Sequence, residues 1–444
     1  MLSDTLTSLK DGDVIFLVEI NDSYFTVAIT RFNLNNYTCE FLHVVRKFHD
    51  AASDNAHDNI YSGILRSLGV IEKEYNDTVA DKVDISKIAF SVQNKLLNMI
   101  KHFSETKFNQ VRKIEMADII SMQYKSIAQF YKIHSGYEIL NMEYSNFIVD
   151  DVISVKNVCG MIAKSLKAPF SLFFAKSGYM DNLSVHSSDA IMNVVSFIPS
   201  ICASAAACLK AKTRDAEIKI GENGTLIIDC GKRQTYFSIY KGGRAECVGA
   251  VEYGGFNITC DIMRAFEVSE SQADKLKLTC GDIHSEESFI VSVDDSDLLS
   301  VTRTLRSIDV NRLQDKCLNH LFGLVLAQLN VSKLSKVMEG VLRIKLCGGV
   351  ANTAGIEQNV KDVFGIHCDV CTPRKIGASI GVKDLDLRAG KDSSMEENAS
   401  YLSVIGMGYF LLNKHKSESS FVSKNFIENI RIKVSCFLNT FFYS

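Results

Sequence analysis

Three short β-type segments followed by a Gly-Gly step constrain the fold of this chain more than any other feature. They span residues 225–255 and read TLIIDCGKRQTYFSIYKGGRAECVGAVEYGG. The first segment is apolar and ends in Asp229, and a Lys-Gly-Gly turn after the second is a hairpin signal. Gly254 and Gly255 then precede a helix-like segment. Backbone N–H groups of a polar turn and of a helix N-terminus can hold a polyphosphate; an ordinary β-meander is the alternative interpretation.

Length, charge and cysteine usage limit the class of protein. With 444 residues the chain is too long for one ordinary core, so we expect two lobes or several subdomains. A net charge of −3 gives no basic excess that would indicate nucleic acid as the main partner. The 13 cysteines are scattered, which favours reduced, buried thiols over a structural zinc site. We expect neither a signal peptide nor a membrane-spanning helix, because the N-terminus is charged and no long uncharged apolar stretch occurs.

The strand–turn–strand pattern occurs a second time near the N-terminus. Residues 14–19 and 24–31 are strand-like runs separated by a short polar turn, and they match residues 225–240 in weaker form. Helix-like segments follow each pair of strands. We therefore expect two β-lobes, each completed by helices, around a cleft.

Other segments have residue patterns that differ from those of the two strand pairs. Residues 93–175 are predicted to be an inserted subdomain of mixed α/β type. A helix of small residues is expected at 198–209, and a long helix at 309–329 with a polar loop before it up to residue 296. Residues 341–346 are predicted to form a strand that ends in Cys-Gly-Gly.

The order of the motifs resembles that of the actin-like ATPases, and specifically of the bacterial cell-division family FtsA. The second phosphate loop of that family, D-I-G-G-G-T-T-D, is matched by DCGKRQTY at 229–236, and its P-V-G-G element by EYGG at 252–255. Its A-E-x-L-K adenosine segment is matched by ADKLK at 273–277, and its T-G-G loop by CGG at 347–349. The helix between the lobes resembles FIPSICAS at 197–204.

The inserted segment carries the resemblance to FtsA in particular. FIVD at 147–150 and NVCGM at 157–161 are similar to the F-I-I-D and N-P-x-G-M elements of its subdomain 1C. The resemblance implies an α/β, duplicated actin-like (ribonuclease H-like) two-lobed fold with an inserted 1C-type subdomain and a C-terminal amphipathic helix. The implied division is lobe 1A (1–92), subdomain 1C (93–175), lobe 2 (176–412, with 2B at about 254–333), a linker (413–420) and an amphipathic membrane-targeting helix (421–444).

The resemblance also implies an ATP site in the cleft. Glu19 and Asp229 would hold Mg²⁺, since hard carboxylates together with phosphates are its usual ligands. The first loop departs from the family pattern D-I-G-T-S-K, because residues 19–24 read EINDSY, and the second loop has Lys232 and Arg233 in place of glycines. We therefore expect ATP binding with at most weak hydrolysis, and we name no catalytic residue. The nucleotide-binding residues carried over are Ser23, Gly231, Lys232, Thr235, Gly254, Gly255, Asp274, Lys277, Gly348 and Gly349.

The last 24 residues have the pattern of an amphipathic helix. A phenylalanine-rich apolar face flanked by basic residues, Arg431 among them, is typical of an in-plane membrane anchor. A helix docked on the body of the protein is the alternative. The FtsA family is similar in ending with a linker and a membrane-targeting helix. The residues expected to contact the membrane are Phe426, Ile427, Ile430, Arg431, Val434, Phe437, Leu438 and Phe441.

Partners are implied by the resemblance alone. FtsA binds the C-terminal peptide of FtsZ on lobe 2B, where Arg303, Arg306 and Arg312 would pair with its carboxylates; solvated surface arginines are the alternative. The family also self-associates into filaments and meets other divisome proteins through 1C. These properties predict a peripheral protein at the cytoplasmic face of the bacterial inner membrane, at the division septum, that tethers FtsZ polymers to an anionic surface.

Two other classes of protein share this fold. One is a pilus-assembly scaffold of the PilM type, and the other is a sugar-kinase-like enzyme. The scaffold normally lacks an amphipathic C-terminal helix and the enzyme would have no use for a membrane anchor, so the tail at 421–444 favours the FtsA-like interpretation.

Overall fold

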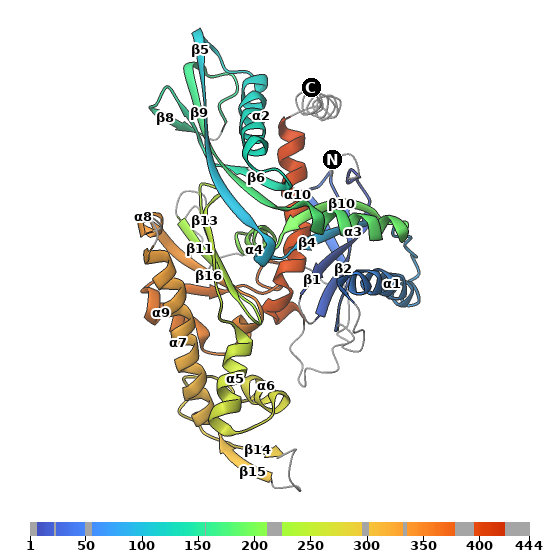
Figure 1. Ribbon diagram of the computed structural model, residues 1–444, viewed down its shortest axis with the longest axis vertical. Helices are drawn as coiled ribbons and strands as arrows, with labels where there is room; N and C mark the ends of the chain where they lie inside the picture. Colours follow the sequence, from blue (N-terminus) through green and yellow to red (C-terminus); the bar gives the residue numbers. More distant parts are fainter. Residues whose placement is uncertain are drawn as a thin grey trace.

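The computed structural model describes residues 7–21, 24–48, 56–155, 157–210, 224–294, 302–331, 335–377 and 395–421. In this part of the chain three five-stranded sheets and one two-stranded hairpin account for the strands. Figure 1 shows one sheet at the upper end, the hairpin at the lower end, and two central sheets between them.

The first central sheet is buried on both faces, which explains its apolar strands. It has the order β10-β4-β1-β2-β3; β1, β2 and β3 are antiparallel, and β4 and β10 run parallel to β1. Phe16 and Val18 pack under α1 and α3, whereas Ile15 and Leu17 face α4 and α10, as the two-residue period of a strand requires. The bounds are β1 Val14–Ile20, β2 Tyr24–Asn33, β3 Thr38–Phe48, β4 Lys87–Val92, β10 Asn193–Pro199, α1 Ala56–Asn76, α3 Ser177–Asp189, α4 Ser200–Cys208 and α10 Leu402–Phe421.

The second central sheet repeats this topology. Its order is β13-β12-β11-β16-β17, again with three antiparallel strands followed by two parallel ones. Helices α5, α6, α7 and α9 cover the core on its outer face. The duplicated α/β architecture predicted from the sequence is therefore confirmed. The bounds are β11 Gly224–Cys230, β12 Thr235–Lys241, β13 Arg244–Val251, β16 Val341–Cys347, β17 Cys368–Val370, α5 Gly255–Phe266, α6 Glu270–Thr279, α7 Ser307–Val331, α8 Ser335–Met338 and α9 Ile356–Phe364.

The third sheet lies within the segment predicted to be an insertion. Its order is β5-β9-β7-β8, with β6 also paired to β9 and α2 packed on β5. The assignment of this sheet to a 1C-type subdomain, and the domain boundaries as a whole, stay predictions. The bounds are β5 Asn98–Lys113, α2 Met116–Ile133, β6 Tyr137–Tyr144, β7 Phe147–Val149, β8 Ile153–Val155 and β9 Ile162–Lys176.

Three local features differ from the sequence-based expectations. Strand β5 was not anticipated, because most of its side chains are exposed and its polar sequence lacks the alternation of a half-buried strand. The expected polar loop up to residue 296 contains β14 (Ile290–Asp294), which forms a hairpin with β15 (Thr302–Arg306). The predicted linker at 413–420 is helical and completes α10, since a helix that is already anchored propagates at low cost through polar residues.

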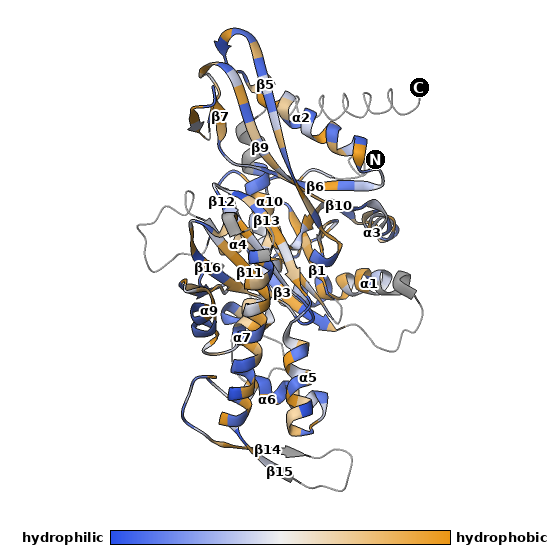
Figure 2. Ribbon diagram, turned by 60° about the vertical axis from the view of Figure 1, so that its left-hand side comes forward, coloured by the Kyte–Doolittle hydropathy of each residue, from blue (hydrophilic) through white to orange (hydrophobic). Residues whose placement is uncertain are grey.

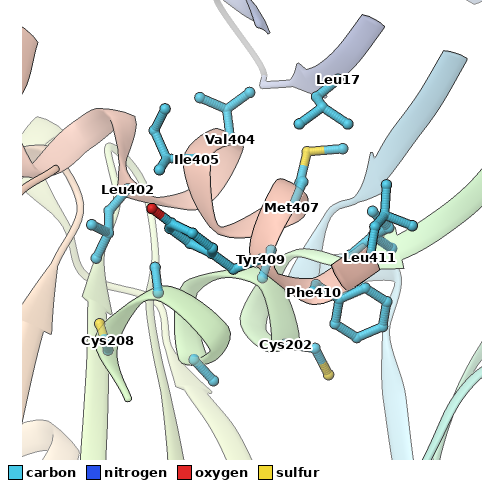
Figure 3. Packing of buried hydrophobic residues seen from close by; sticks show 14 of the residues in the cluster. Leu17, Cys202, Cys208, Leu402, Val404, Ile405, Met407, Tyr409, Phe410 and Leu411 are labelled. Carbon is cyan, nitrogen blue, oxygen red and sulfur yellow. The ribbon is translucent and has the colours of Figure 1, made fainter. Parts of the chain in front are cut away.

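Helices α4 and α10 cross at the centre of the molecule, between the two central sheets (Figure 1). Small residues make the crossing close: a Cβ atom on Gly406 would lie 2.0 Å from the carbonyl oxygen of Ala203. Figure 3 shows the apolar side chains of α10 filling the space around α4. In Figure 2 the central sheets are largely hydrophobic, whereas α6 and α9 present hydrophilic residues. Among the described helices, none is long and apolar enough to cross a membrane.

Candidate nucleotide site

The turn between β11 and β12 lies against the N-terminus of α5. The amide of Gly255 donates to the carbonyl oxygen of Gly231 at 3.0 Å, and that of Phe256 donates to the carbonyl oxygen of Lys232 at 2.7 Å. A Cβ atom on Gly254 would lie 2.6 Å and 2.7 Å from the same two oxygens, so only glycine fits. The Gly-Gly step therefore joins turn and helix, as the sequence indicated. Two N–H groups of the helix are used within the chain, however, which reduces its capacity to bind an anion.

The loop after β16 reaches the same place. Gly348 has a positive φ of 87°, and its Cβ atom would lie 2.6 Å from Oδ1 of Asp229 and 2.6 Å from the carbonyl oxygen of Cys230. Its amide donates to the carbonyl oxygen of Ala399 at 3.2 Å. Gly348 is thus required both for its conformation and for its close approach to β11. An added Cβ on Gly349, which begins the short 3₁₀ helix η3 (Gly349–Asn352), would meet nothing within 4 Å.

Helix α6 contributes a charged cluster beside the Gly-Gly step. Nζ of Lys277 donates to Oδ1 of Asp274 at 2.6 Å, to Oγ1 of Thr259 at 2.6 Å and to the carbonyl oxygen of Gly255 at 3.3 Å. Burial would raise the pKa of Asp274, but hydrogen bonds from Lys277 and Thr259 outweigh it and hold the pKa below its usual value. The cluster therefore keeps an ion pair next to the first turn of α5.

Two carboxylates from equivalent strands of the two sheets lie close enough to interact electrostatically. Glu19 on β1 is 7% exposed, and its Oε2 has no hydrogen-bond partner among the residues that the structure describes. Burial raises the pKa of Glu19 to about 7; Arg46 opposes this shift and Asp229 adds to it. Burial also raises the pKa of Asp229, whose Oδ2 accepts from Oγ of Ser204 at 2.9 Å. An unpartnered buried oxygen beside a second carboxylate suits a hard cation such as Mg²⁺.

Arg46 was not anticipated in the sequence reasoning, yet it lies near Glu19 and acts on its carboxylate. Its Nε donates to Oγ1 of Thr26 at 3.1 Å, and its Nη1 and Nη2 donate to Oγ and the carbonyl oxygen of Ser400 at 3.0 Å and 3.1 Å. The guanidinium carbon lies 4.2 Å from the ring centre of Tyr24 and 4.3 Å from that of Tyr401. Tyr24 occupies the position of the lysine in the family's first loop. This departure was a sign in the sequence that the surroundings of the first loop differ here. Nothing in the sequence pairs Arg46 with residue 400.

The remaining residues of the second loop make contacts within the chain. Oγ1 of Thr235 donates to the carbonyl oxygen of Tyr253 at 2.8 Å, so its hydroxyl has a structural role. The cationic ends of Lys232 and Arg233 lie 5.9 Å and 5.0 Å from the ring centre of Phe256. These cations therefore lie over the first turn of α5, within reach of the predicted site.

The other predicted residues lie away from the cleft or outside the described residues. Arg306 forms an ion pair with Asp309 on α7, with distances of 2.8 Å and 3.1 Å, and Arg312 is exposed on the same helix. The side chain of Arg303 is outside the described part of the structure. Among the described residues no three His, Cys, Asp or Glu side chains gather as a metal site, so Mg²⁺ would need ligands from a nucleotide as well. Outside the described residues lie Ser23 and the predicted membrane contacts Phe426, Ile427, Ile430, Arg431, Val434, Phe437, Leu438 and Phe441.

The two sheets differ in the residues that they place here. On the side of the second sheet, glycines 231, 254, 255 and 348 allow close approach of the loops near Asp229 and Lys277, and ATP binding at this place stays a prediction. On the side of the first sheet, the space beside Glu19 holds Arg46 and Tyr24.

Comparison with known proteins shows which family this chain is similar to. The model of the family "Cell division protein FtsA" matches residues 226–406, a range that contains the whole second-sheet half of the cleft. The chain is thus similar to FtsA proteins, and its fold is that of the actin-like proteins.

The curated relatives are distant and only partly covered. FtsA of Borreliella burgdorferi is 26% identical over 254 residues, which cover 56% of this chain and 59% of the relative. FtsA of Buchnera aphidicola subsp. Baizongia pistaciae is 22% identical over 356 residues, with 76% and 78% covered. FtsA of Streptococcus pneumoniae is 24% identical, with 54% and 50% covered. The match thus spans about half to three quarters of the length of these FtsA proteins.

Solved structures agree on the fold of the FtsA-like chain. A chain of the PilM–PilN type IV pilus biogenesis complex superposes with a TM-score of 0.58 at 10% identity, covering 90% of this chain and 98% of that one. MreB5 of Spiroplasma citri bound to AMPPNP gives a TM-score of 0.51 at 10% identity, with 93% and 100% covered. At such identities the likeness shows the actin-like fold alone.

Proposed function

We propose that this FtsA-like chain acts in bacterial cell division as a peripheral tether that links FtsZ polymers to the cytoplasmic membrane at the septum. The match of the FtsA family model to residues 226–406 carries the proposal. The amphipathic sequence at 421–444 supports the membrane contact, because phenylalanines on one face and basic residues beside them favour an anionic bilayer surface.

We propose that lobe 2B binds the FtsZ peptide and that filaments form by self-association. Of the three arginines predicted to contact the peptide, Arg312 is exposed, whereas Arg306 has Asp309 as a partner. Arg312 is therefore the stronger candidate for pairing with a peptide carboxylate.

We infer that ATP binds in the cleft, with its phosphates near Gly254, Gly255, Gly348 and Lys277. Glu19 and Asp229 would hold Mg²⁺, which would supply positive charge between the phosphates and the two carboxylates. The neighbouring cations Lys232 and Arg233 favour phosphate but replace the glycines of the family's loop. Because both phosphate loops depart from the family pattern, they favour at most weak hydrolysis of ATP.

The test is co-sedimentation with liposomes that contain anionic lipid. The full chain is compared with a chain that ends at Phe421, which keeps α10 whole. We expect the full chain to pellet and to carry added FtsZ with it, and the shortened chain to stay in the supernatant.

A matched pair of variants controls for the effect of added charge. Phe437→Asp with Phe441→Asp alters the apolar face of the tail, and Ser435→Asp with Asn439→Asp alters its polar face. The first pair should abolish sedimentation and the second should only weaken it. If the full chain stays soluble at every lipid composition, the tether fails, and the pilus-scaffold and enzyme alternatives take its place.

A further inference from the structure

We infer that Arg46 is a clamp between the two central sheets, so that their relative position depends on the chain's own side chains more than on a bound nucleotide. The inference deepens the proposed function, since it rests on the nucleotide cleft proposed above. Four sets of contacts carry it.

The first contact fixes Arg46 to its own sheet. Arg46 lies on β3 directly opposite Thr26 on β2, and its Nε donates to the hydroxyl of that residue at 3.1 Å. The guanidinium group is therefore held in one orientation, with both terminal nitrogens directed away from the sheet.

The second set of contacts crosses to η5 (Ala399–Tyr401), a short 3₁₀ helix that precedes α10. Both terminal nitrogens of Arg46 donate to Ser400, one to the hydroxyl and one to the carbonyl oxygen. A planar guanidinium can make such a paired contact, whereas a lysine cannot.

Further hydrogen bonds connect η5 to the glycine loop of the second sheet. The carbonyl oxygen of Ala399 accepts from the amide of Gly348 at 3.2 Å, and the amide of Ala399 donates to Oδ1 of Asn352 at 2.8 Å. Nδ2 of Asn352 donates to Oδ1 of Asn398 at 2.8 Å. A continuous line of hydrogen bonds therefore runs from β3 to the loop that follows β16.

Two aromatic rings contact the guanidinium group of Arg46, one from each of the two parts that it joins. Tyr24 belongs to the first sheet and Tyr401 to η5, and both rings lie within 4.3 Å of the guanidinium carbon. Tyr401 is only 1% exposed, so this contact is shielded from water, where a cation–π interaction is strongest.

The charge of Arg46 completes the argument. Its positive charge lies close enough to Glu19, one of the two carboxylates proposed to hold Mg²⁺, to act on it electrostatically. Arg46 thus supplies between the sheets the kind of charge that a metal ion with phosphates would bring. A nucleotide should consequently add little to the closure of the cleft.

The experiment compares Arg46→Ala with Arg31→Ala in the full chain. Arg31 lies on β2 of the same sheet but meets Glu40 at the surface, at 4.0 Å and with 41% of its side chain exposed. The melting temperature is measured alone, with Mg²⁺ and ATP, and with Mg²⁺ and ADP. We expect Arg46→Ala to lower the melting temperature by roughly 2–4 °C more than Arg31→Ala. The rise caused by nucleotide should also be larger in Arg46→Ala than in the natural chain. Equal melting temperatures for the two variants would overturn the clamp.

Ser400→Ala tests the same link without removing a charge. We expect a smaller fall, and the double variant with Arg46→Ala should melt no lower than Arg46→Ala alone, because both changes break one interaction. Fully additive falls contradict the clamp. If Arg46→Ala does not fold, Arg46→Lys replaces it in this cycle, with the same expected non-additivity.

The melting experiments test the clamp independently of the liposome experiment that tests the proposed function. Neither lipid nor FtsZ is present, so a failed liposome experiment leaves the clamp intact. If neither nucleotide changes the melting temperature of any variant, the proposed ATP site fails, while the comparison of Arg46→Ala with Arg31→Ala still decides the clamp.

Discussion

At the scale of single residues, glycines and other small side chains decide how closely the elements of this chain approach. Gly254 lets the start of α5 reach the turn after β11, Gly348 lets the loop after β16 reach β11, and Gly406 lets α10 lie on α4. Figure 3 shows how tightly the side chains of α10 surround that crossing. Each position has no room for one more carbon atom, so each should be sensitive to alanine.

The clearest case is Gly406→Ala. The new methyl group would lie 2.0 Å from the carbonyl oxygen of Ala203, so the two helices must separate. We expect the free energy of unfolding to fall by about 1–3 kcal/mol, the usual cost of overpacking a core. Chemical denaturation followed by circular dichroism measures it.

Gly323→Ala is the matched control, because Gly323 lies in the middle of α7 and an added Cβ meets nothing within 4 Å. That change should be neutral or stabilise the protein by up to ~1 kcal/mol, since alanine favours the helix. Equal effects of the two substitutions would show that the helix crossing is looser than described.

At the scale of elements, the pair α5–α6 forms the most polar wall of the proposed nucleotide site. Lys277 connects the two helices through Asp274, Thr259 and the backbone of Gly255. Its ammonium group lies beside the Gly-Gly step and therefore close to the place proposed for the phosphates.

Lys277→Ala should therefore weaken the binding of ATP. Loss of a charge-assisted hydrogen bond removes about 1.5–3 kcal/mol, which corresponds to an increase in Kd of roughly tenfold or more. Isothermal titration calorimetry with Mg²⁺ and ATP measures the change. Lys275→Ala, on the exposed side of the same helix, should leave Kd unchanged. If both variants bind alike, Lys277 only joins the helices and does not contact the nucleotide.

At the scale of the whole molecule, a polar network attaches the third sheet to the second. Glu143 on β6 accepts from the amide of Ala245 at 2.9 Å and from the hydroxyl of Tyr240 at 3.2 Å. Ser171 on β9 donates to the carbonyl oxygen of Ala245 at 2.6 Å and accepts from Arg244 at 3.0 Å. The position of the third sheet, at the top of Figure 1, thus depends on the carboxyl group of Glu143, which lies in an interface that is partly shielded from water.

This network predicts a dependence of stability on pH. Burial raises the pKa of Glu143 from its ordinary 4.5 to about 7, although hydrogen bonds from Ala245 and Tyr240 oppose the shift. The folded state therefore holds a proton that the unfolded state releases. The stabilisation contributed by this protonated group is fully present below pH 4.5 and is lost as pH rises through 7. Between pH 5 and about pH 8 the melting temperature of Glu143→Gln should fall less than that of the natural chain.

Glu105→Gln serves as the control for this titration. Glu105 lies on β5 of the same sheet and forms a surface ion pair with Lys107 at 3.6 Å. Its loss should leave the pH profile unchanged, and part of the slope should persist in Glu143→Gln because the pKa of Glu19 is also raised to about 7. A profile that Glu143→Gln leaves as steep as before would contradict the role of this group.

The sequence by itself determined the elements whose residues follow a local pattern. The apolar runs of β1 and β11, the Gly-Gly step before α5 and the small-residue helix α4 were predicted because strand period, turn residues and side-chain size are local properties. The order of these elements was enough to indicate a duplicated fold and an FtsA-like family. The amphipathic tail at 421–444 stays a prediction from the sequence.

The tertiary structure alone decided how distant residues meet. Arg46 and Ser400 are 354 positions apart, and Glu143 and Ala245 are 102 apart, so no local pattern could pair them. Strand β5 escaped prediction for a related reason, since its pairing with β9 stabilises a largely polar sequence without a regular apolar alternation. Hydrophobic periodicity reports which side of an element is buried, but not which partner covers it, and the character of the cleft depends on that partner.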